Sequence, residues 1–327
     1  MNTRLFGRDK VEISEVGLGC WQLGGNWSHV EDETAKAILN ASLDAGITFL
    51  DTADVYGAGR SETIIGDFLK ETNRDDVFVA TKVGRLDLYP DMYTEESVRS
   101  HIEDSLKRLQ TDSLDLVQTH CVPPKVMESG EIYQWLGTLK QEGKIRRLAA
   151  SIETIEEALM LIENVPDLYS LQVIFNIFRQ KPIHELFDKA KEKQVGIIAR
   201  VPLASGVLSG KFTKETTFGT GDHRNFNKDG QIFNVGETFA GVPFERGIEF
   251  AQKIETLRPE GMSLAQMALR WILDHDAVSV VIPGATKPEQ AISNAAVSNF
   301  PPLGEEIHNQ LDRLYKDEIH QEVRGAY

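Results

Sequence analysis

The stretch ITFLDTADVYGAGRSE, residues 47–62, joins a short apolar run to a cluster of polar side chains. The run ITFL has the composition of a strand that enters a hydrophobic core. Directly after it come Asp51, Asp54 and Tyr56, and the chain then turns at two glycines. We interpret the stretch as a buried strand whose end carries two acids and a phenol into a polar site.

Similar apolar or β-branched runs recur along the chain, about every 25 to 40 residues. Amphipathic segments separate them, as in residues 95–110, where Val98, Ile102 and Leu106 share one helical face. Buried parallel strands read as continuous apolar runs with crossover helices between them. The pattern predicts one (β/α)8 TIM barrel domain, of class α/β, over residues 1–327. Its eight expected strands are residues 16–20, 47–51, 77–82, 114–120, 146–152, 171–176, 196–202 and 278–284.

An open, doubly wound sheet is the alternative that the same alternation allows. Its usual fingerprint, GxGxxG after the first strand, is missing, because GLGCWQLGG does not fit the spacing. The segment GVLSGKF, residues 206–212, resembles a nucleotide-binding P-loop but is one residue short and ends in Phe. Both observations favour the barrel.

Two segments interrupt the alternation. TRLFGRDKVEIS, residues 3–14, reads as an N-terminal β-hairpin with its turn near residues 7–10, which would cap the lower end of the barrel. Residues 210–242, between the seventh and eighth strands, form a long segment rich in Gly, Thr and Asn with little periodicity. A loop of this length in a compact domain is more often a lid or binding element than a linker.

The charge balance excludes some classes of partner. Fifty acidic residues against 35 basic ones give a formal charge of −15, which would repel nucleic acid and anionic lipid. The chain shows neither a run long enough to span a bilayer nor a signal-peptide core at its start, so we expect a cytoplasmic protein. Its two cysteines, Cys20 and Cys121, are expected to be free thiols. The sequence leaves the oligomeric state open.

The ends of three successive strands carry side chains suited to acid–base chemistry. Asp51 ends the second strand with Tyr56 just beyond it, Lys82 ends the third and His120 ends the fourth. In a barrel these ends meet at one rim, where active sites lie. An ammonium beside the phenol is expected to lower the pKa of Tyr56, and the imidazole can polarise a carbonyl oxygen. The group contains no good nucleophile and no set of ligands for a metal, so a hydride donor is the natural partner.

The chain resembles the aldo-keto reductase family over essentially its whole length. The motifs that match, in family order, are RLFGRDKVEISEVGLGCWQLGG, DTADVYG, ATKVG, LDLVQTH, PLASGVLSGK and VIPGATKPEQAISN. The resemblance implies a catalytic tetrad of Asp51, Tyr56, Lys82 and His120. It also implies reversible, NADPH-dependent reduction of an aldehyde or ketone to an alcohol, with the proton supplied by Tyr56. The cofactor, NADPH or NADP+, would lie extended across the top of the barrel.

The resemblance further implies which residues hold the cofactor. Ser151 and Gln172 match positions that bind the nicotinamide carboxamide. Residues 202–211 match the loop over the pyrophosphate, and residues 284–294 match the adenosine site. Lys287, near a helix N-terminus, favours NADPH over NADH because it can receive a 2′-phosphate. The predicted cofactor-binding residues are Ser151, Gln172, Arg200, Pro202, Leu203, Ser205, Gly206, Leu208, Lys211, Gly284, Thr286, Lys287, Gln290 and Asn294.

The sequence departs from the family pattern at two positions. Ile152 follows Ser151 where the family usually has Asn, and Arg200 stands where an aromatic ring often stacks on the nicotinamide. A guanidinium plane can stack similarly, or it can contact an anionic substrate. The predicted substrate-binding residues are Trp21, Trp27, Val55 and Cys121, with Arg85 and residues 223–233 as further candidates.

A second function stays open at this point. Some barrels of this family serve as cofactor-bound regulatory or sensing subunits of membrane channels, with little turnover, and such subunits can retain the tetrad. The reductase hypothesis requires steady consumption of NADPH with a small-molecule carbonyl substrate.

Overall fold

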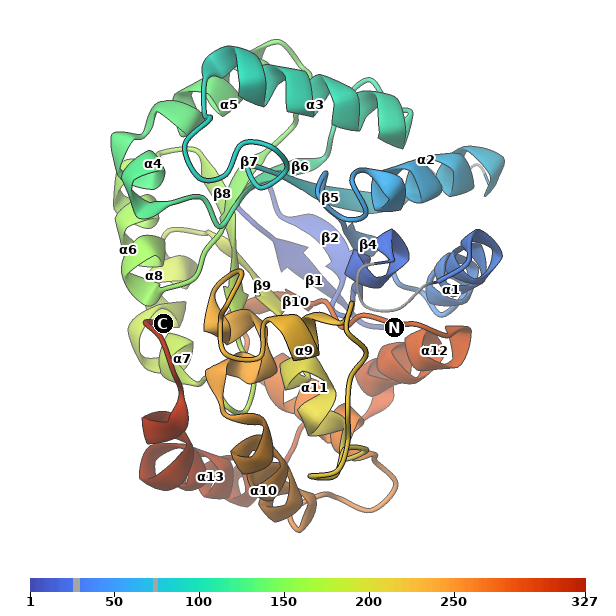
Figure 1. Ribbon diagram of the computed structural model, residues 1–327, viewed down its shortest axis with the longest axis vertical. Helices are drawn as coiled ribbons and strands as arrows, with labels where there is room; N and C mark the ends of the chain where they lie inside the picture. The colour runs from blue at the N-terminus through green and yellow to red at the C-terminus, as the bar shows by residue number, and fades with distance from the viewer. Residues whose placement is uncertain (26–29, 73–75) are drawn as a thin grey trace.

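The computed structural model describes residues 1–25, 30–72 and 76–327. Eight parallel strands lie side by side in the order β3 to β10, as expected for a (β/α)8 barrel (Figure 1). Isolated parallel bridges pair Val16 with Val281 and Gly19 with Gly284, which joins the two edges of the sheet. The strands are β3 Leu18–Gly19, β4 Phe49–Asp51, β5 Phe78–Val83, β6 Leu116–His120, β7 Leu148–Ser151, β8 Leu168–Ile174, β9 Gly196–Arg200 and β10 Val278–Val281.

All eight strand predictions are confirmed, with shorter bounds at most ends. The strand β8 differs because it begins at Leu168, before the expected start at residue 171. The register aligns the strand ends, since Lys82 pairs with Gln118, and Ser151 pairs with both His120 and Gln172. Polar side chains from successive strands therefore meet at one rim.

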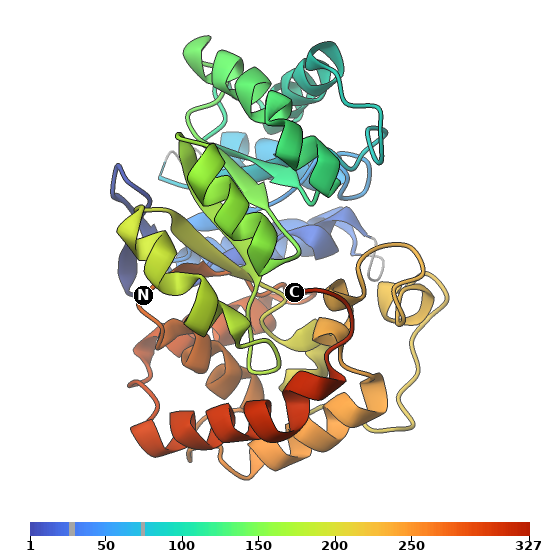
Figure 2. The ribbon, with the colours of Figure 1, turned by 90° about the vertical axis from the view of Figure 1, so that its left-hand side faces the viewer.

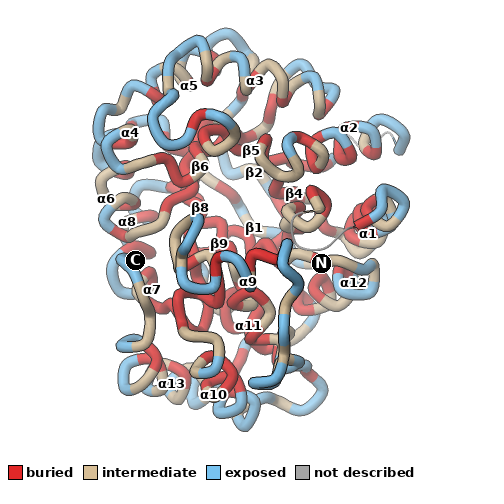
Figure 3. The backbone as a smooth tube through the Cα atoms, viewed as in Figure 1, coloured by how far each residue is buried: buried red, intermediate tan, exposed pale blue. Residues whose placement is uncertain are grey.

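Helices surround the strands, and their buried faces explain the amphipathic pattern of the sequence (Figure 3). Helix α3 begins with a capping box, in which the side chain of Thr94 accepts a hydrogen bond from the Ser97 backbone. No helix in the described ranges is long and apolar enough to cross a membrane. The helices are α1 Asp32–Asp44, α2 Arg60–Thr72, α3 Glu95–Leu109, α4 Pro124–Ser129, α5 Glu131–Gln141, α6 Ile155–Asn164, α7 Lys181–Glu185, α8 Phe187–Glu192, α9 His223–Phe226, α10 Phe244–Glu255, α11 Leu264–Leu273, α12 Pro288–Ala295 and α13 Glu305–Leu314.

The predicted hairpin is present and closes one end of the barrel. Its strands β1 Thr3–Phe6 and β2 Val11–Ser14 pair antiparallel. The Phe6 ring is fully buried, and its centroid lies 5.0 to 5.8 Å from the rings of Tyr169, Phe49 and Phe78. Aromatic rings of the hairpin and the strands therefore fill the base of the barrel.

The long segment between β9 and β10 lies at the opposite end from the hairpin (Figure 2). It contains the short helix α9 and is held by a cluster of aromatic rings, in which Phe218 packs against Phe212, Phe239 and Phe244. The expectation of a long loop at residues 210–242 is confirmed. Its own apolar cluster explains how a segment without periodicity is ordered.

Candidate active site

Lys82 is the centre of a buried polar network at the rim of the barrel. Its ammonium donates hydrogen bonds to Asp51 Oδ2 at 2.6 Å, to the Thr52 carbonyl at 2.9 Å and to Tyr56 Oη at 3.1 Å. These three bonds account for all three N–H donors of a lysine. The Lys82 side chain is 1% exposed, so its position relative to the phenol is fixed by its partners.

Asp51 is held on its second oxygen by two amides. Oδ1 accepts hydrogen bonds from the side-chain nitrogens of Gln118 at 3.1 Å and Gln172 at 2.6 Å. Gln118, which is fully buried on β6, did not emerge from the sequence. The available signal was its position two residues before His120, which in a strand places both side chains on the same face.

The phenol of Tyr56 keeps its proton. Burial raises the pKa of Tyr56 to about 12, because desolvation outweighs the lowering effect of the nearby Lys82. The expectation of a lowered phenol pKa is therefore wrong in its net direction, although the contribution of the ammonium has the expected sign. Burial also opposes the charged form of Lys82, but Asp51 and Tyr56 outweigh it and raise the lysine pKa above its usual range. Together they form a protonated phenol held by an ammonium.

His120 lies beside the phenol as a neutral imidazole. Its ring centroid is 5.8 Å from that of Tyr56, edge to face. Burial lowers the pKa of His120 well below its usual value, and the positive charges of Lys82, Arg85 and Arg200 act in the same direction. Its Nδ1 is buried without a hydrogen-bond partner among the described residues. A neutral imidazole has one N–H that can donate to a carbonyl oxygen.

Aromatic rings from two loops cover the phenol. Trp21 stacks on Tyr56, with ring centroids 5.9 Å apart and planes 20° apart. On Trp21 lie His223, at 4.9 Å, and Phe233, at 6.3 Å, both from the long loop. The segment 223–233, a candidate from sequence, therefore reaches the site through these two rings.

A cavity of about 800 Å³ opens above this network. A volume of this size is typical of a small-molecule or cofactor site. The cavity runs from the phenol past β9 and the following loop to the beginning of α12, and its lining includes Tyr56, Arg200, Gly206, Thr286 and Asn294.

The sequence profile of the Aldo/keto reductase family matches residues 15–316. The chain belongs to this family. It is 32% identical over 323 residues to the aldo-keto reductase YhdN of Bacillus subtilis, covering 96% of this chain and 93% of the relative.

Solved structures of aldo-keto reductases share the fold. The glycerol dehydrogenase AKR11B4 from Gluconobacter oxydans has a TM-score of 0.74 and 30% identity, covering 99% of this chain and 97% of that one. An aldo-keto reductase from Klebsiella pneumoniae, solved in complex with NADPH, has a TM-score of 0.72 and 26% identity, with 96% and 95% covered.

Most of the predicted cofactor and substrate residues of this aldo/keto reductase line the cavity. Lys287 is not part of the lining, Leu208 is fully buried in the hydrophobic core, and Cys121 is buried and does not line the cavity. Trp27 lies outside the described residues. The predicted residues in the lining are Asp51, Tyr56, His120, Ser151, Gln172, Arg200, Pro202, Leu203, Ser205, Gly206, Lys211, Gly284, Thr286, Gln290, Asn294, Trp21 and Val55, together with Arg85.

Hydrogen bonds order the part of the cavity that is predicted to hold the adenosine of the cofactor. Gln290 Oε1 accepts from the backbone and hydroxyl of Thr286 at 2.7 and 3.1 Å. In the loop predicted to cover the pyrophosphate, Gly206 has a φ of +97°, and a Cβ there would lie 2.9 Å from the Phe212 ring. A side chain at this position would be strained and would displace the Phe212 ring, and glycine leaves the backbone of the loop open toward a ligand. The residues present therefore fit an extended dinucleotide.

The two departures from the family pattern meet in a cluster of charges beside His120. Arg200 pairs with Glu237 of the long loop at 2.5 Å and donates to the Ile152 carbonyl at 2.9 Å. Arg85 pairs with Glu153 at 3.0 Å. Glu237 did not emerge from the sequence, because nothing in the irregular loop marks it.

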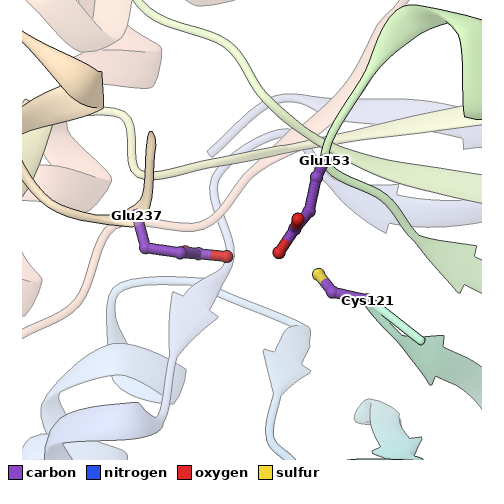
Figure 4. Close-up of side chains that lie close together, drawn as sticks. All are labelled: Cys121, Glu153 and Glu237. Atoms are coloured by element: carbon purple, nitrogen blue, oxygen red, sulfur yellow. The ribbon is translucent and has the colours of Figure 1, made fainter. Parts of the chain in front are cut away.

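Figure 4 shows the carboxylates of Glu153 and Glu237 and the thiol of Cys121 pointing toward a common point. One ligand atom of each lies within 4.8 Å of the others, a spacing that suits a metal ion. Each carboxylate is already paired with an arginine, however, and two guanidinium groups would repel a cation. We therefore assign no metal to this cluster.

Proposed function

We propose that this aldo/keto reductase reduces a small aldehyde or ketone to the alcohol with NADPH, and catalyses the reverse oxidation when alcohol is in excess. The observation that carries the proposal is the contact between Lys82 Nζ and Tyr56 Oη on the floor of the cavity. A protonated phenol aimed into a cavity, with an ammonium behind it, is a proton donor for an oxygen.

NADPH is the cofactor that the chain best supports. The Klebsiella relative was solved with NADPH, and the cavity of this chain, about 800 Å³, is lined by residues from Tyr56 through the loop after β9 to the beginning of α12. Ser151 and Gln172 would hold the nicotinamide end, residues 202–211 the pyrophosphate, and residues 284–294 the adenosine end. When bound, NADPH supplies the hydride that reduces the carbonyl carbon.

The chain's own residues complete the reaction at the carbonyl oxygen. The neutral His120 donates a hydrogen bond to that oxygen and orients it. Tyr56 then transfers its proton, and Lys82 stabilises the phenolate that forms. Asp51, fixed by Gln118 and Gln172, keeps the ammonium charged and in place.

A panel of small aldehydes tests this function. Purified protein is mixed with NADPH and each aldehyde, and absorbance at the nicotinamide wavelength is followed for many turnovers. We expect steady oxidation of NADPH with at least one aldehyde. Consumption that stops below one equivalent per chain would instead support a regulatory or sensing subunit.

Parallel titrations with NADPH and NADH test the cofactor preference. We expect tighter binding of NADPH. Lys287 does not itself line the cavity, but it follows Thr286, which does, at the N-terminus of α12, and we expect Lys287→Ala to weaken NADPH binding while leaving NADH binding unchanged. Equal affinities for both cofactors would remove the assignment of Lys287 to a 2′-phosphate. Lys316, an exposed lysine on the C-terminal part of the chain, provides a matched control as Lys316→Ala.

A further inference from the structure

Four charged side chains stand on one side of the candidate substrate pocket, and we call Arg85, Glu153, Arg200 and Glu237 the charged wall. They come from four places in the chain: Arg85 follows β5, Glu153 follows β7, Arg200 ends β9, and Glu237 belongs to the long loop. Three of them, all except Glu153, line the cavity next to Tyr56 and His120. The wall is therefore next to the predicted reacting centre.

The wall is held in place by its hydrogen bonds, since Arg85, Glu153 and Arg200 each have more than one partner and Glu237 is paired with Arg200. Glu153 accepts from Arg85 at 3.0 Å and from the Asn234 side chain at 2.9 Å. Arg85 Nε also donates to the carbonyl of His120 at 3.2 Å. Arg200 binds both Glu237 and the Ile152 carbonyl. Side chains held in this way keep their positions when a substrate enters.

The charges of the wall compensate one another. Two guanidinium groups face two carboxylates at 3.0 Å or less. Arg200 and Arg85 outweigh the effect of burial and lower the pKa of Glu237, so that this carboxylate is ionised at neutral pH. A phosphate or carboxylate on the substrate would meet these anions in a poorly solvated site, and a cation would meet the arginines. Net neutral compounds avoid both penalties.

The wall nevertheless has hydrogen-bonding capacity that its internal bonds do not use. An arginine has five N–H donors, and the bonds of Arg85 to described residues use two of them. Arg200 Nε is buried without a hydrogen-bond partner in the described part of the chain. A hydroxyl group both donates and accepts, so it can bind a guanidinium and a carboxylate together, and bonds to charged groups are the stronger ones.

We propose, on the basis of the reductase function above, that the charged wall makes the enzyme select small neutral carbonyl compounds with hydroxyl groups near the carbonyl. The rings of Trp21 and Phe233 line the same cavity as the wall and offer an apolar surface for the carbon skeleton of such a compound. A plain aliphatic aldehyde would desolvate the wall without satisfying it, and sites built to bind a hydroxyl reject such analogues strongly.

Three aldehydes of the same chain length test the proposal on the unaltered enzyme. They are glyceraldehyde, which is neutral and dihydroxylated, propanal, which has no hydroxyl, and glyceraldehyde 3-phosphate, which is anionic. With NADPH, we expect kcat/KM for glyceraldehyde to exceed both others by at least tenfold. Equal or better turnover of propanal, or preference for the phosphate, would overturn the proposal while leaving the reductase function intact. Absence of turnover with every aldehyde overturns both.

A charge-neutral exchange tests the residues themselves. The double variant Arg85→Met, Glu153→Gln removes one ion pair without leaving an unpaired charge, and we expect the ratio of kcat/KM for glyceraldehyde over propanal to fall at least tenfold. The matched control is Arg99→Met, Glu142→Gln, which removes an ion pair between helical surfaces, and its ratio should equal that of the parent. Thermal unfolding checks that both variants are folded. An unchanged ratio in a folded Arg85 variant would overturn the role of the wall.

Discussion

Lys82 Nζ lies 3.1 Å from Tyr56 Oη, so the phenol has a cation as its hydrogen-bond partner on the side away from the cavity. Replacement by Tyr56→Phe removes the proton donor and preserves the ring that stacks on Trp21. We expect kcat/KM for aldehyde reduction to fall by about 10²–10⁴-fold, the usual contribution of a positioned acid. Fluorescence titration should give an unaltered dissociation constant for NADPH. Retained turnover in this variant would remove Tyr56 from the mechanism.

The ion pair of Lys82 with Asp51 predicts a difference between single and double variants. Lys82→Met leaves the Asp51 carboxylate buried without its cation, which we expect to cost about 3–5 kcal/mol of unfolding free energy. The double variant Lys82→Met, Asp51→Asn removes both charges and should recover part of that loss. Both variants should lack activity. Denaturant unfolding measures the stabilities, and a double variant less stable than the single one would contradict the pairing.

Gly206 predicts a link between backbone conformation and cofactor binding. Its φ of +97° makes Gly206→Ala strained, at a cost of about 1–2 kcal/mol, and the new Cβ would also displace the Phe212 ring. We expect NADPH binding to weaken at least fivefold. Gly261 has a similar φ of +84° and open space around it, so Gly261→Ala should show the strain alone, with normal NADPH affinity. Equal NADPH affinities in the two variants would show that this loop does not bind the cofactor.

The base of the barrel predicts a large effect from a residue far from the site. Phe6→Ala removes a fully buried ring that touches three others, and we expect a loss of about 3–5 kcal/mol. Its neighbour Leu5 is 62% exposed, so Leu5→Ala should change the unfolding free energy by less than about 0.5 kcal/mol. Similar values for the two would show that the hairpin does not seal the barrel.

His275 predicts a pH dependence of stability. Burial beside Trp271 and Phe175 lowers the pKa of His275 to about 4. Below about pH 6.5, His275 is protonated in the unfolded chain but stays neutral in the folded chain. The free energy of unfolding therefore falls as the pH drops from about 6.5 to about 4. The contribution is at most about 1.4 kcal/mol per pH unit. His275→Gln should reduce this slope relative to the parent, but the slope should not vanish in that variant, because burial also lowers the pKa of His223 to about 4. Chemical denaturation at several pH values measures the slope of parent and variant.

The arrangement of the barrel was predictable because strand alternation is a local property of the chain. Lys82 and His120 could be placed near Asp51 from sequence, since parallel strands of a barrel end at one rim. The extent of a single domain over residues 1–327, and the roles of the site residues, stay predictions.

The features that escaped prediction depend on packing between distant segments. Glu237 reaches Arg200 because the Phe218 cluster folds the long loop back over the rim, and no local pattern encodes that path. The pKa of Tyr56 was misjudged because the charge of Lys82 was visible in the sequence and the degree of burial was not. The burial of Leu208 in the core was likewise not visible in the sequence.

The aromatic rings around Phe6 close the base of the barrel, and the cavity lies at the other end, where residues of the segment 210–242 line it. Glu237 and Phe233 of this segment are among the residues that line the cavity. Substrate and cofactor must then enter, and product must leave, through this one end of the barrel.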